Sequence, residues 1–172
     1  MATARRIPEG HEGVTAYLTI KDAAKAIDFY KRVFGATEVM RLADKQGRIG
    51  HAELKIGNRF LMLSDEHPEY GRSGPQPGGG RMPVGMHLYV EDVDTVYKKA
   101  LAAGAKQARP PTNEFYGDRA AQFLDPFGHQ WMISTHVEDV SVTEMQHRFE
   151  EFMSKQGQSG QQPEKGQAQT KR

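Results

Sequence analysis

Three side chains of this sequence are candidates for acid–base or metal chemistry: His51, Glu53 and His87. His51 and Glu53 stand two positions apart among alternating apolar residues, so they should share one face of a β-strand. Imidazole titrates near neutral pH, so the histidines could act as acid, base or hydrogen-bonding groups toward an organic ligand. The set could instead hold a metal ion, although strand positions i and i+2 are well separated. The third interpretation is that all three form hydrogen bonds within a sheet or are solvated.

An internal repeat supplies the elements that would position these side chains. Residues 15–37 read TAYLTIKDAAKAIDFYKRVFGAT, and residues 85–106 read GMHLYVEDVDTVYKKALAAGAK. Each copy runs as a strand, an acidic helix start, an amphipathic helix and a Gly-Ala pair. Asp22 and Asp92 are the predicted N-caps, and the glycine of each pair is predicted to end its helix.

Three more strands are predicted after each helix, because apolar segments there are bounded by turn residues. They span residues 38–42, 49–56 and 59–64 in the first copy and residues 106–109, 120–124 and 130–135 in the second. With first strands at residues 15–20 and 85–90, the sequence predicts an α+β fold of two tandem βαβββ modules with mixed sheets.

The segments outside the two modules are predicted from composition. A Gly- and Pro-rich stretch favours an irregular linker, and a capping box at Ser141 and Glu144 ahead of spaced apolar residues predicts a C-terminal helix. The last residues are polar without an apolar anchor, which indicates disorder. The predicted parts are an N-terminal extension (1–11), a first module (12–65), a linker (66–83), a second module (84–137), a C-terminal helix (138–155) and a disordered tail (156–172).

Composition excludes several classes of function. Lys and Arg number 23 against 22 acidic residues, so a net charge of +1 gives no electrostatic reason to expect nucleic acid or an anionic membrane as partner. The absence of cysteine excludes disulfides and thiolate metal sites, and it fits a reducing compartment. The start of the chain lacks a secretory signal, and no apolar run reaches about 18 residues. We therefore expect a soluble, cytoplasmic protein.

Several segments of the chain are similar to a known family. These are AIDFYKRVFGA, HAELKIGNRFLMLSDE, LYVEDVD and EFYGDRAAQFLDPFGHQW, within residues 12–137. Together with the two-module layout, they resemble the vicinal oxygen chelate superfamily of glyoxalases, bleomycin-resistance proteins and extradiol dioxygenases, and in particular its glyoxalase-like, phosphonate-operon-associated branch. The resemblance implies cup-shaped sheets around a cavity, a homodimer, and often a divalent metal held by His, Gln or Glu.

The metal positions implied by the resemblance carry unsuitable residues in this chain. They fall on Thr15, on Leu61 or Met62, on Gly85 and on Met132. A hydroxyl, a thioether and a glycine cannot replace imidazole or carboxylate donors. We therefore expect no cofactor and no standard metal site. The alternative is a divalent metal such as nickel, zinc, iron or manganese on displaced ligands, among them His51, Glu53 and His87.

The same registration turns other side chains toward the implied cavity. If Met132 points inward, strand alternation also turns His87 and Ser134 inward, and it assigns Trp131 and Ile133 to the helix side. A loop at residues 114–119 is predicted at the mouth of the cavity. The side chains expected to bind a ligand are Tyr17, Thr19, Tyr89, Tyr116, Arg119 and Gln130. Tyr116 would stack on the ligand and Arg119 would hold an anionic group, unless Asp118 and Arg119 only fix the loop. His129 is expected to be exposed.

These features leave three functional hypotheses. The leading one is a glyoxalase- or bleomycin-resistance-like protein that binds a small organic molecule in a polar and aromatic cavity without the standard metal. The second is a metal-dependent lyase, isomerase or dioxygenase of glyoxalase type with displaced ligands. The third is a dimeric scaffold whose cup is vestigial. The apolar stripe after Ser141 should pack on its own chain or on a dimer partner.

Overall fold

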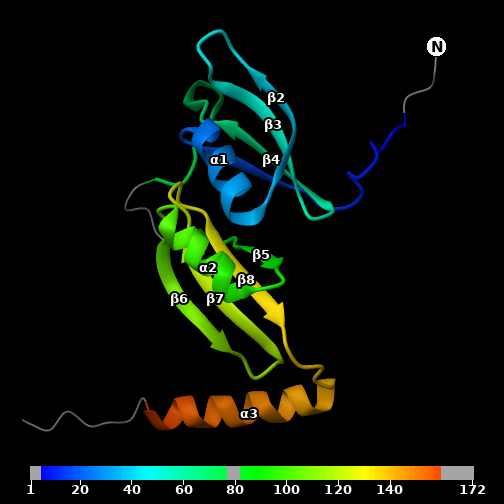
Figure 1. Ribbon diagram of the computed structural model, residues 1–172, viewed down its shortest axis with the longest axis vertical. Coiled ribbons are helices and arrows are strands. Elements are labelled where there is room, and N and C mark those ends of the chain that lie inside the picture. The colour runs from blue at the N-terminus through cyan, green and yellow to red at the C-terminus, as the bar shows by residue number, and fades with distance from the viewer. Residues whose placement is uncertain (1–4, 77–81, 160–172) are drawn as a thin grey trace, which may run out of the picture.

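A computed structural model describes residues 5–76 and 82–159 of the chain. The first residues of the predicted N-terminal extension, part of the predicted linker and residues 160–172 of the predicted tail lie outside the described ranges. The described elements form two four-stranded sheets, each with one helix on a single face, followed by a separate C-terminal helix (Figure 1). The predicted α+β fold of two tandem βαβββ modules is confirmed.

The first module contains one sheet and the helix that covers it. Strand β1 (Ala16–Ile20) runs parallel to β4 (Arg59–Asp65), and β4, β3 (Ile49–Ile56) and β2 (Thr37–Ala43) are antiparallel neighbours. Helix α1 (Ala23–Phe34) connects β1 to β2. The strand order is β1-β4-β3-β2, so β1 lies at one edge of the sheet.

The second module repeats this topology with different lengths. Strand β5 (Met86–Tyr89) is parallel to β8 (Gln130–His136), which pairs with β7 (Asp118–Leu124), and β7 pairs with β6 (Lys106–Asn113). Helix α2 (Val93–Ala102) connects β5 to β6. The prediction that β6 ends at residue 109 is wrong: the strand continues through two prolines. Proline is tolerated there because β6 is an edge strand with a register shift at that place.

The predicted helix ends are close to the observed ones. The Asp22 carboxylate accepts a hydrogen bond from the Lys25 amide, and that of Asp92 accepts one from the Thr95 amide, so both N-caps are confirmed. Gly35 caps α1 with φ +67°. Helix α2 reaches its C-cap at Ala103, one position before the predicted glycine.

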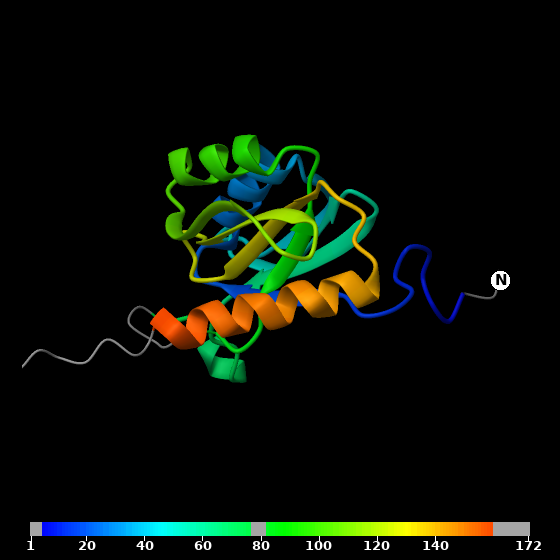
Figure 2. The same cartoon turned by 90° about the horizontal axis from the view of Figure 1, so that it is seen from below.

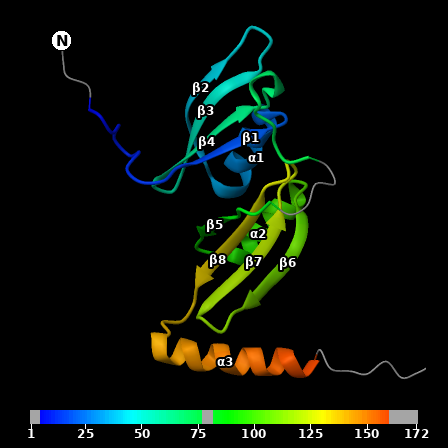
Figure 3. The same ribbon diagram turned by 180° about the vertical axis from the view of Figure 1, so that it is seen from behind.

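Helices α1 and α2 lie side by side on the same side of the two sheets (Figure 2). We define the open face of each sheet as the face opposite its helix; Figure 3 views both sheets from that side. Side chains on the helix side are buried in one continuous apolar core that includes residues of both modules. The open faces carry the polar side chains of alternate positions.

Helix α1 also joins the modules, because its aromatic residues contact the second sheet. The Phe34 ring lies 4.5 Å from that of Trp131, and the Tyr30 hydroxyl donates to the buried Asp125 carboxylate over 2.8 Å. Asp125 also accepts from the Trp131 indole and from the amides of Phe127 and His129. This carboxylate therefore binds α1 to the β7–β8 turn. His129 is only 3% exposed in that turn, so the expectation of an exposed His129 is wrong.

The segments outside the modules differ in part from the predictions. The linker contains a short 3-10 helix, η1 (Pro68–Tyr70). Helix α3 (Val142–Ser159) extends past the predicted end at residue 155, and the Ser141 hydroxyl caps it by accepting from the Glu144 amide. It lies at the far end of the second module (Figure 1), where Phe149 and Phe152 contact only Phe115 among the aromatic rings described. No helix in the described ranges is both long and apolar enough to cross a membrane.

Candidate functional site

The open face of the first module brings together His51, Glu53 and Tyr17. Strands β1, β4 and β3 are adjacent, and Met62 is the register partner of both Tyr17 and Glu53. The Tyr17 hydroxyl lies 3.0 Å from Nδ1 of His51, and Nε2 of His51 lies 3.3 Å from Oε1 of Glu53. These side chains therefore form a continuous chain of polar contacts from a phenol through an imidazole to a carboxylate.

A fourth member of this chain, His11, comes from the segment before β1. Its Nε2 lies 3.5 Å from Oε2 of Glu53, and its ring stacks on that of Phe60 at 4.2 Å between centroids. Gly10 lies against the same Phe60 ring with φ +80°, a backbone conformation that favours glycine. Sequence reasoning missed His11, because its only local signal is a position between glycines ahead of the first strand.

Two cations lie over aromatic rings of the same face. The Arg72 guanidinium lies 5.8 Å from the centre of the Tyr17 ring, and Lys55 Nζ lies 6.0 Å from that of Phe60. Cations at such distances are attracted to the face of the ring. The site thus combines imidazoles, a carboxylate and aromatic surface with positive charge at its margin.

The open face of the second module has a separate polar network. Nε2 of His87 lies 2.9 Å from the buried Ser134 hydroxyl, and the His87 ring lies 4.8 Å from that of Tyr89. The Tyr89 hydroxyl donates to Asp118 over 2.6 Å, and Nδ1 of His136 lies 2.8 Å from the other oxygen of Asp118. The hydrogen bond to Asp118 raises the pKa of Tyr89, and the same carboxylate raises the pKa of His136.

The other residues predicted to bind a ligand occupy different surroundings. Thr19 and Gln130 lie half-buried on the open faces of β1 and β8. Tyr116 is half-buried in the loop before β7, and burial raises the pKa of its phenol. Arg119 lies on the helix side of β7, where its guanidinium forms a paired contact with Asp94 of α2 at 2.7 and 2.8 Å. Its partner is therefore a carboxylate of its own module.

The three residues first proposed for chemistry are not all brought together. His51 and Glu53 are neighbours on the first sheet, whereas His87 lies on the second sheet, and the two sheets share no strand pairing. In the described parts of the chain, no hydrogen bond, ion pair or ring contact joins His87 to either of the other two.

The positions implied for a metal do not fit one. Of the two possibilities on β4, Leu61 is buried in the core and Met62 lies on the open face, and Met132 is its counterpart on β8. A thioether at both places does not suit the hard or borderline divalent ions of this fold. Nor does any group of three His, Asp or Glu side chains in residues 5–76 and 82–159 have an arrangement that could hold a metal ion.

Comparison with known proteins places these features in a family. Residues 13–133 match the model of the Glyoxalase/Bleomycin resistance protein/Dioxygenase superfamily. An uncharacterized protein of Mycobacterium tuberculosis (strain ATCC 25618 / H37Rv) is 38% identical over 135 residues, which cover 77% of this chain and 79% of the relative. An uncharacterized protein of Mycobacterium bovis has the same identity, and the match covers 89% of its length.

Solved structures agree with this match. TioX from Micromonospora sp. ML1 is 28% identical with a TM-score of 0.57, over 73% of this chain and 99% of that chain. A glyoxalase/bleomycin resistance protein/dioxygenase family enzyme from Burkholderia phytofirmans PsJN shares the fold at 19% identity, with a TM-score of 0.56 over 72% of this chain and 97% of that chain. Because the matched model covers both modules, the chain belongs to the glyoxalase/bleomycin resistance protein/dioxygenase superfamily.

Proposed function

We propose that this protein binds a small organic molecule on the open face of its first module. The observation that supports this proposal is the chain of contacts Tyr17, His51, Glu53 and His11. Polar groups of this kind beside the aromatic surface of Phe60 are the usual lining of a small-molecule site. The ligand would therefore be an aromatic or otherwise apolar molecule that carries hydrogen-bonding groups.

The contacts also define what the site could do to its ligand. An imidazole held between a phenol and a carboxylate has its ring orientation fixed, and it can pass a proton between donor and acceptor atoms. Glu53, which lies between two imidazoles, would accept a proton from the ligand, and His51 would hold it in place. This chemistry needs no metal at the positions of Met62 and Met132.

A thermal-shift screen tests the proposed binding. Aromatic antibiotics, thiol adducts and phosphonates are added to the purified full-length chain, and a ligand that binds only the folded state raises the melting temperature. At a concentration of about 100 times Kd the expected stabilisation is about 2.7 kcal/mol, or a shift of roughly 5–10 °C for a chain of this size.

Matched variants test whether a ligand found in the screen binds on the open face of the first module. Tyr17→Phe and Glu53→Gln should remove most of the shift, because each deletes one member of the contact chain. Tyr70→Phe is the control, since Tyr70 is an exposed tyrosine of η1 outside that chain. A ligand whose shift is equal in all three variants binds elsewhere and contradicts the proposal.

The second candidate function is a metal-dependent lyase, isomerase or dioxygenase that uses displaced ligands. It requires His87 to approach His51 and Glu53, which a second copy of the chain could bring about. Metal analysis of protein purified without an affinity tag distinguishes the two functions. Stoichiometric nickel, zinc, iron or manganese that is lost in His87→Ala would favour the metal enzyme over metal-free binding.

We further propose that the protein is a homodimer of the phosphonate-operon-associated branch and acts in the cytoplasm. The unpaired edges of β1 and β5 and the exposed apolar residues of α3, among them Phe149 and Met153, support self-association. The segments AIDFYKRVFGA and LYVEDVD support the branch, and the lack of cysteine fits a reducing compartment. A monomer in light scattering would contradict the dimer.

A further inference from the structure

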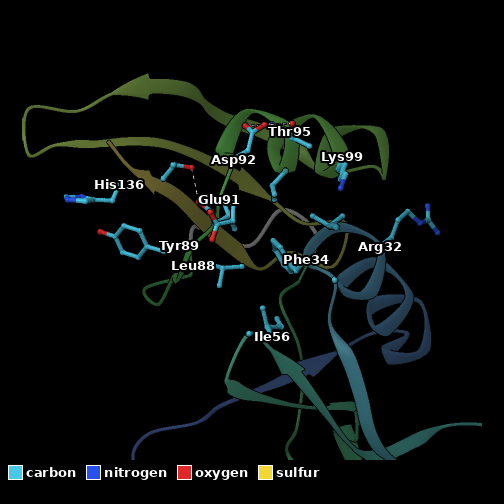
Figure 4. Close-up of a pocket in the computed structure, with 16 residues that line it drawn as sticks. Arg32, Phe34, Ile56, Leu88, Tyr89, Glu91, Asp92, Thr95, Lys99 and His136 are labelled. Atoms are coloured by element: carbon cyan, nitrogen blue, oxygen red, sulfur yellow. Dashed lines mark hydrogen bonds between the residues drawn. The ribbon is translucent and has the colours of Figure 1, made fainter. Parts of the chain in front are cut away.

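A groove between the modules lies beside the edge strand β5, apart from the proposed site on the open face of the first module. Tyr89 and His136 of the polar network of the second module reach one end of it. The volume of the groove is about 770 Å³, within the range of small-molecule sites. The last turn of α1, the β3–β4 turn, β5 and the first turns of α2 form its walls, so both modules contribute (Figure 4). The residues of the proposed open-face site do not line it.

The floor of the groove is apolar and accessible. Phe34 of α1, Ile56 of β3 and Leu88 of β5 converge there from three different elements, and each is only half-buried. Such side chains lose contact with water when an apolar molecule covers them, which favours binding by roughly 25 cal/mol per Å² of apolar surface.

Charge is distributed unequally along the groove. Arg32 and Lys99 lie toward one end, and Glu91 lies nearer the other end with Tyr89 and His136 (Figure 4). A second carboxylate, that of the N-cap Asp92, also lines the groove and is bound to Thr95. Neither Arg32 nor Lys99 has a hydrogen bond or ion pair with its side chain in the described residues, whereas Arg119 and Arg148 are both bound to carboxylates.

Each of these two cations also has a structural role. Both lie near the C-terminal end of a helix, where positive charge stabilises the helix dipole. That role explains the charge of each residue separately. It does not explain why the two helices direct their free cations to the same end of a groove with an apolar floor.

We infer that this groove is a second binding site, for an organic anion with an apolar body such as an aliphatic or aromatic carboxylate. The carboxylate lies between Arg32 and Lys99, and the apolar body covers Phe34, Ile56 and Leu88. Glu91 at the other end opposes a second negative charge and so favours a monoanion.

The intrinsic fluorescence of a tryptophan can report on ligand binding at this site. Trp131 is the single tryptophan of the chain, and the ring centre of Trp131 lies 4.5 Å from that of Phe34, the central residue of the floor. A ligand that covers Phe34 should change the emission of Trp131. Octanoate is a suitable probe, because it carries the required charge and does not absorb at the excitation wavelength of tryptophan.

The experiment titrates octanoate into the full-length chain and compares it with octylammonium, which has the same body and the opposite charge. Octanoate should change Trp131 emission saturably and octylammonium should not. Lys99→Glu and Arg32→Glu should each weaken octanoate binding by roughly tenfold, as expected when attraction to a charged group becomes repulsion. Lys98→Glu, the adjacent lysine of α2 outside the groove, should leave it within about twofold.

A further variant should strengthen octanoate binding instead of weakening it. Glu91→Gln removes one of the two carboxylates that line the groove, leaving the N-cap Asp92, and should strengthen octanoate binding by roughly two- to threefold. The inference is overturned if octanoate causes no saturable change in Trp131 emission, or if Lys98→Glu weakens octanoate binding as much as Lys99→Glu does. It is also overturned if Tyr17→Phe removes octanoate binding. The last outcome would assign the anion to the open face, so it is distinguishable from failure of the proposed function.

Discussion

The two modules share one topology but stabilise it with different chemistry at equivalent places. At the end of β4, the Asp65 carboxylate accepts from the amides of Asp22, Ala23 and Ile49 at 2.6 to 3.1 Å. At the end of β8, the Thr135 hydroxyl accepts from the Val93 amide and from no other amide in the described residues, and it donates to the Val90 carbonyl. A helix start can therefore be bound to its sheet by a charge or by a hydroxyl, and the repeat preserves the position rather than the residue type.

The turns that join the last two strands differ more. In the first module this turn consists of Gly57 and the exposed Asn58, without a buried polar group. In the second module it contains Asp125, whose carboxylate has no exposed surface and accepts from Tyr30 of the first module. A buried carboxylate that binds the other module is therefore present in the β7–β8 turn and absent from the β3–β4 turn, and this asymmetry can be tested.

Removal of the Asp125 carboxylate should have the largest effect on stability. Asp125→Ala leaves the buried donors of Tyr30, Trp131, Phe127 and His129 without their acceptor. We expect the free energy of unfolding to fall by about 3–5 kcal/mol. Urea denaturation followed by Trp131 emission and by far-UV circular dichroism measures this change.

The equivalent turn of the first module provides the control for this variant. Asn58→Ala should change the free energy of unfolding by less than about 0.5 kcal/mol, since the side chain is exposed. Similar losses from the two variants would show that the modules are not joined through the β7–β8 turn.

The two helix starts give the second prediction. Asp65→Ala removes an acceptor from three amides, whereas Thr135→Ala removes it from one. We expect losses of about 2–3 kcal/mol for the first variant and about 1 kcal/mol for the second. Urea midpoints measured under the same conditions give the difference, and equal losses would contradict a stronger anchor in the first module.

A smaller effect should follow from disturbing the segment that carries His11. A Cβ atom at Gly10 would stand 2.7 Å from the Phe60 ring, and the φ of +80° is strained for alanine. Gly10→Ala should therefore reduce stability by about 1 kcal/mol and move His11 away from Glu53. Gly13 has a similar φ of +92°, but a Cβ atom there would meet no atom within 4 Å. Gly13→Ala therefore measures the cost of the backbone conformation without a steric clash. A change in the His51 imidazole NMR signals in Gly10→Ala alone would locate the effect at the site.

The sequence predicted the modules because their periodicity is local. Alternation in β3 correctly placed His51 and Glu53 together on the open face, since neighbouring polar positions on one strand need no tertiary knowledge. The pairing of His11 with Glu53 and the burial of His129 depend on segments far apart in the sequence. Nothing in a local pattern shows that a turn histidine will be buried beside a carboxylate that the other module's helix also binds, and the same holds for the groove at Phe34.

The two histidines at the ends of β8, His129 just before it and His136 as its last residue, should change stability with pH in opposite directions. Burial lowers the pKa of His129, so its contribution is present above about pH 6.5 and is lost as pH falls. Hydrogen bonds to Asp118 and then to Asp139 raise the pKa of His136, so its contribution is present below about pH 6.5 and is lost as pH rises through the raised value.

Variants of the two histidines test these opposite directions. His129→Gln should reduce the loss of stability on acidification, and His136→Gln should reduce the loss on alkalinisation. The measurement is the urea midpoint of each variant between about pH 5 and 8. Because the His136 side chain is half-exposed, 1 M salt should weaken its effect while that of His129 persists. A change of the same sign in both variants would show that the two ends of β8 do not differ in the way their burial and partners indicate.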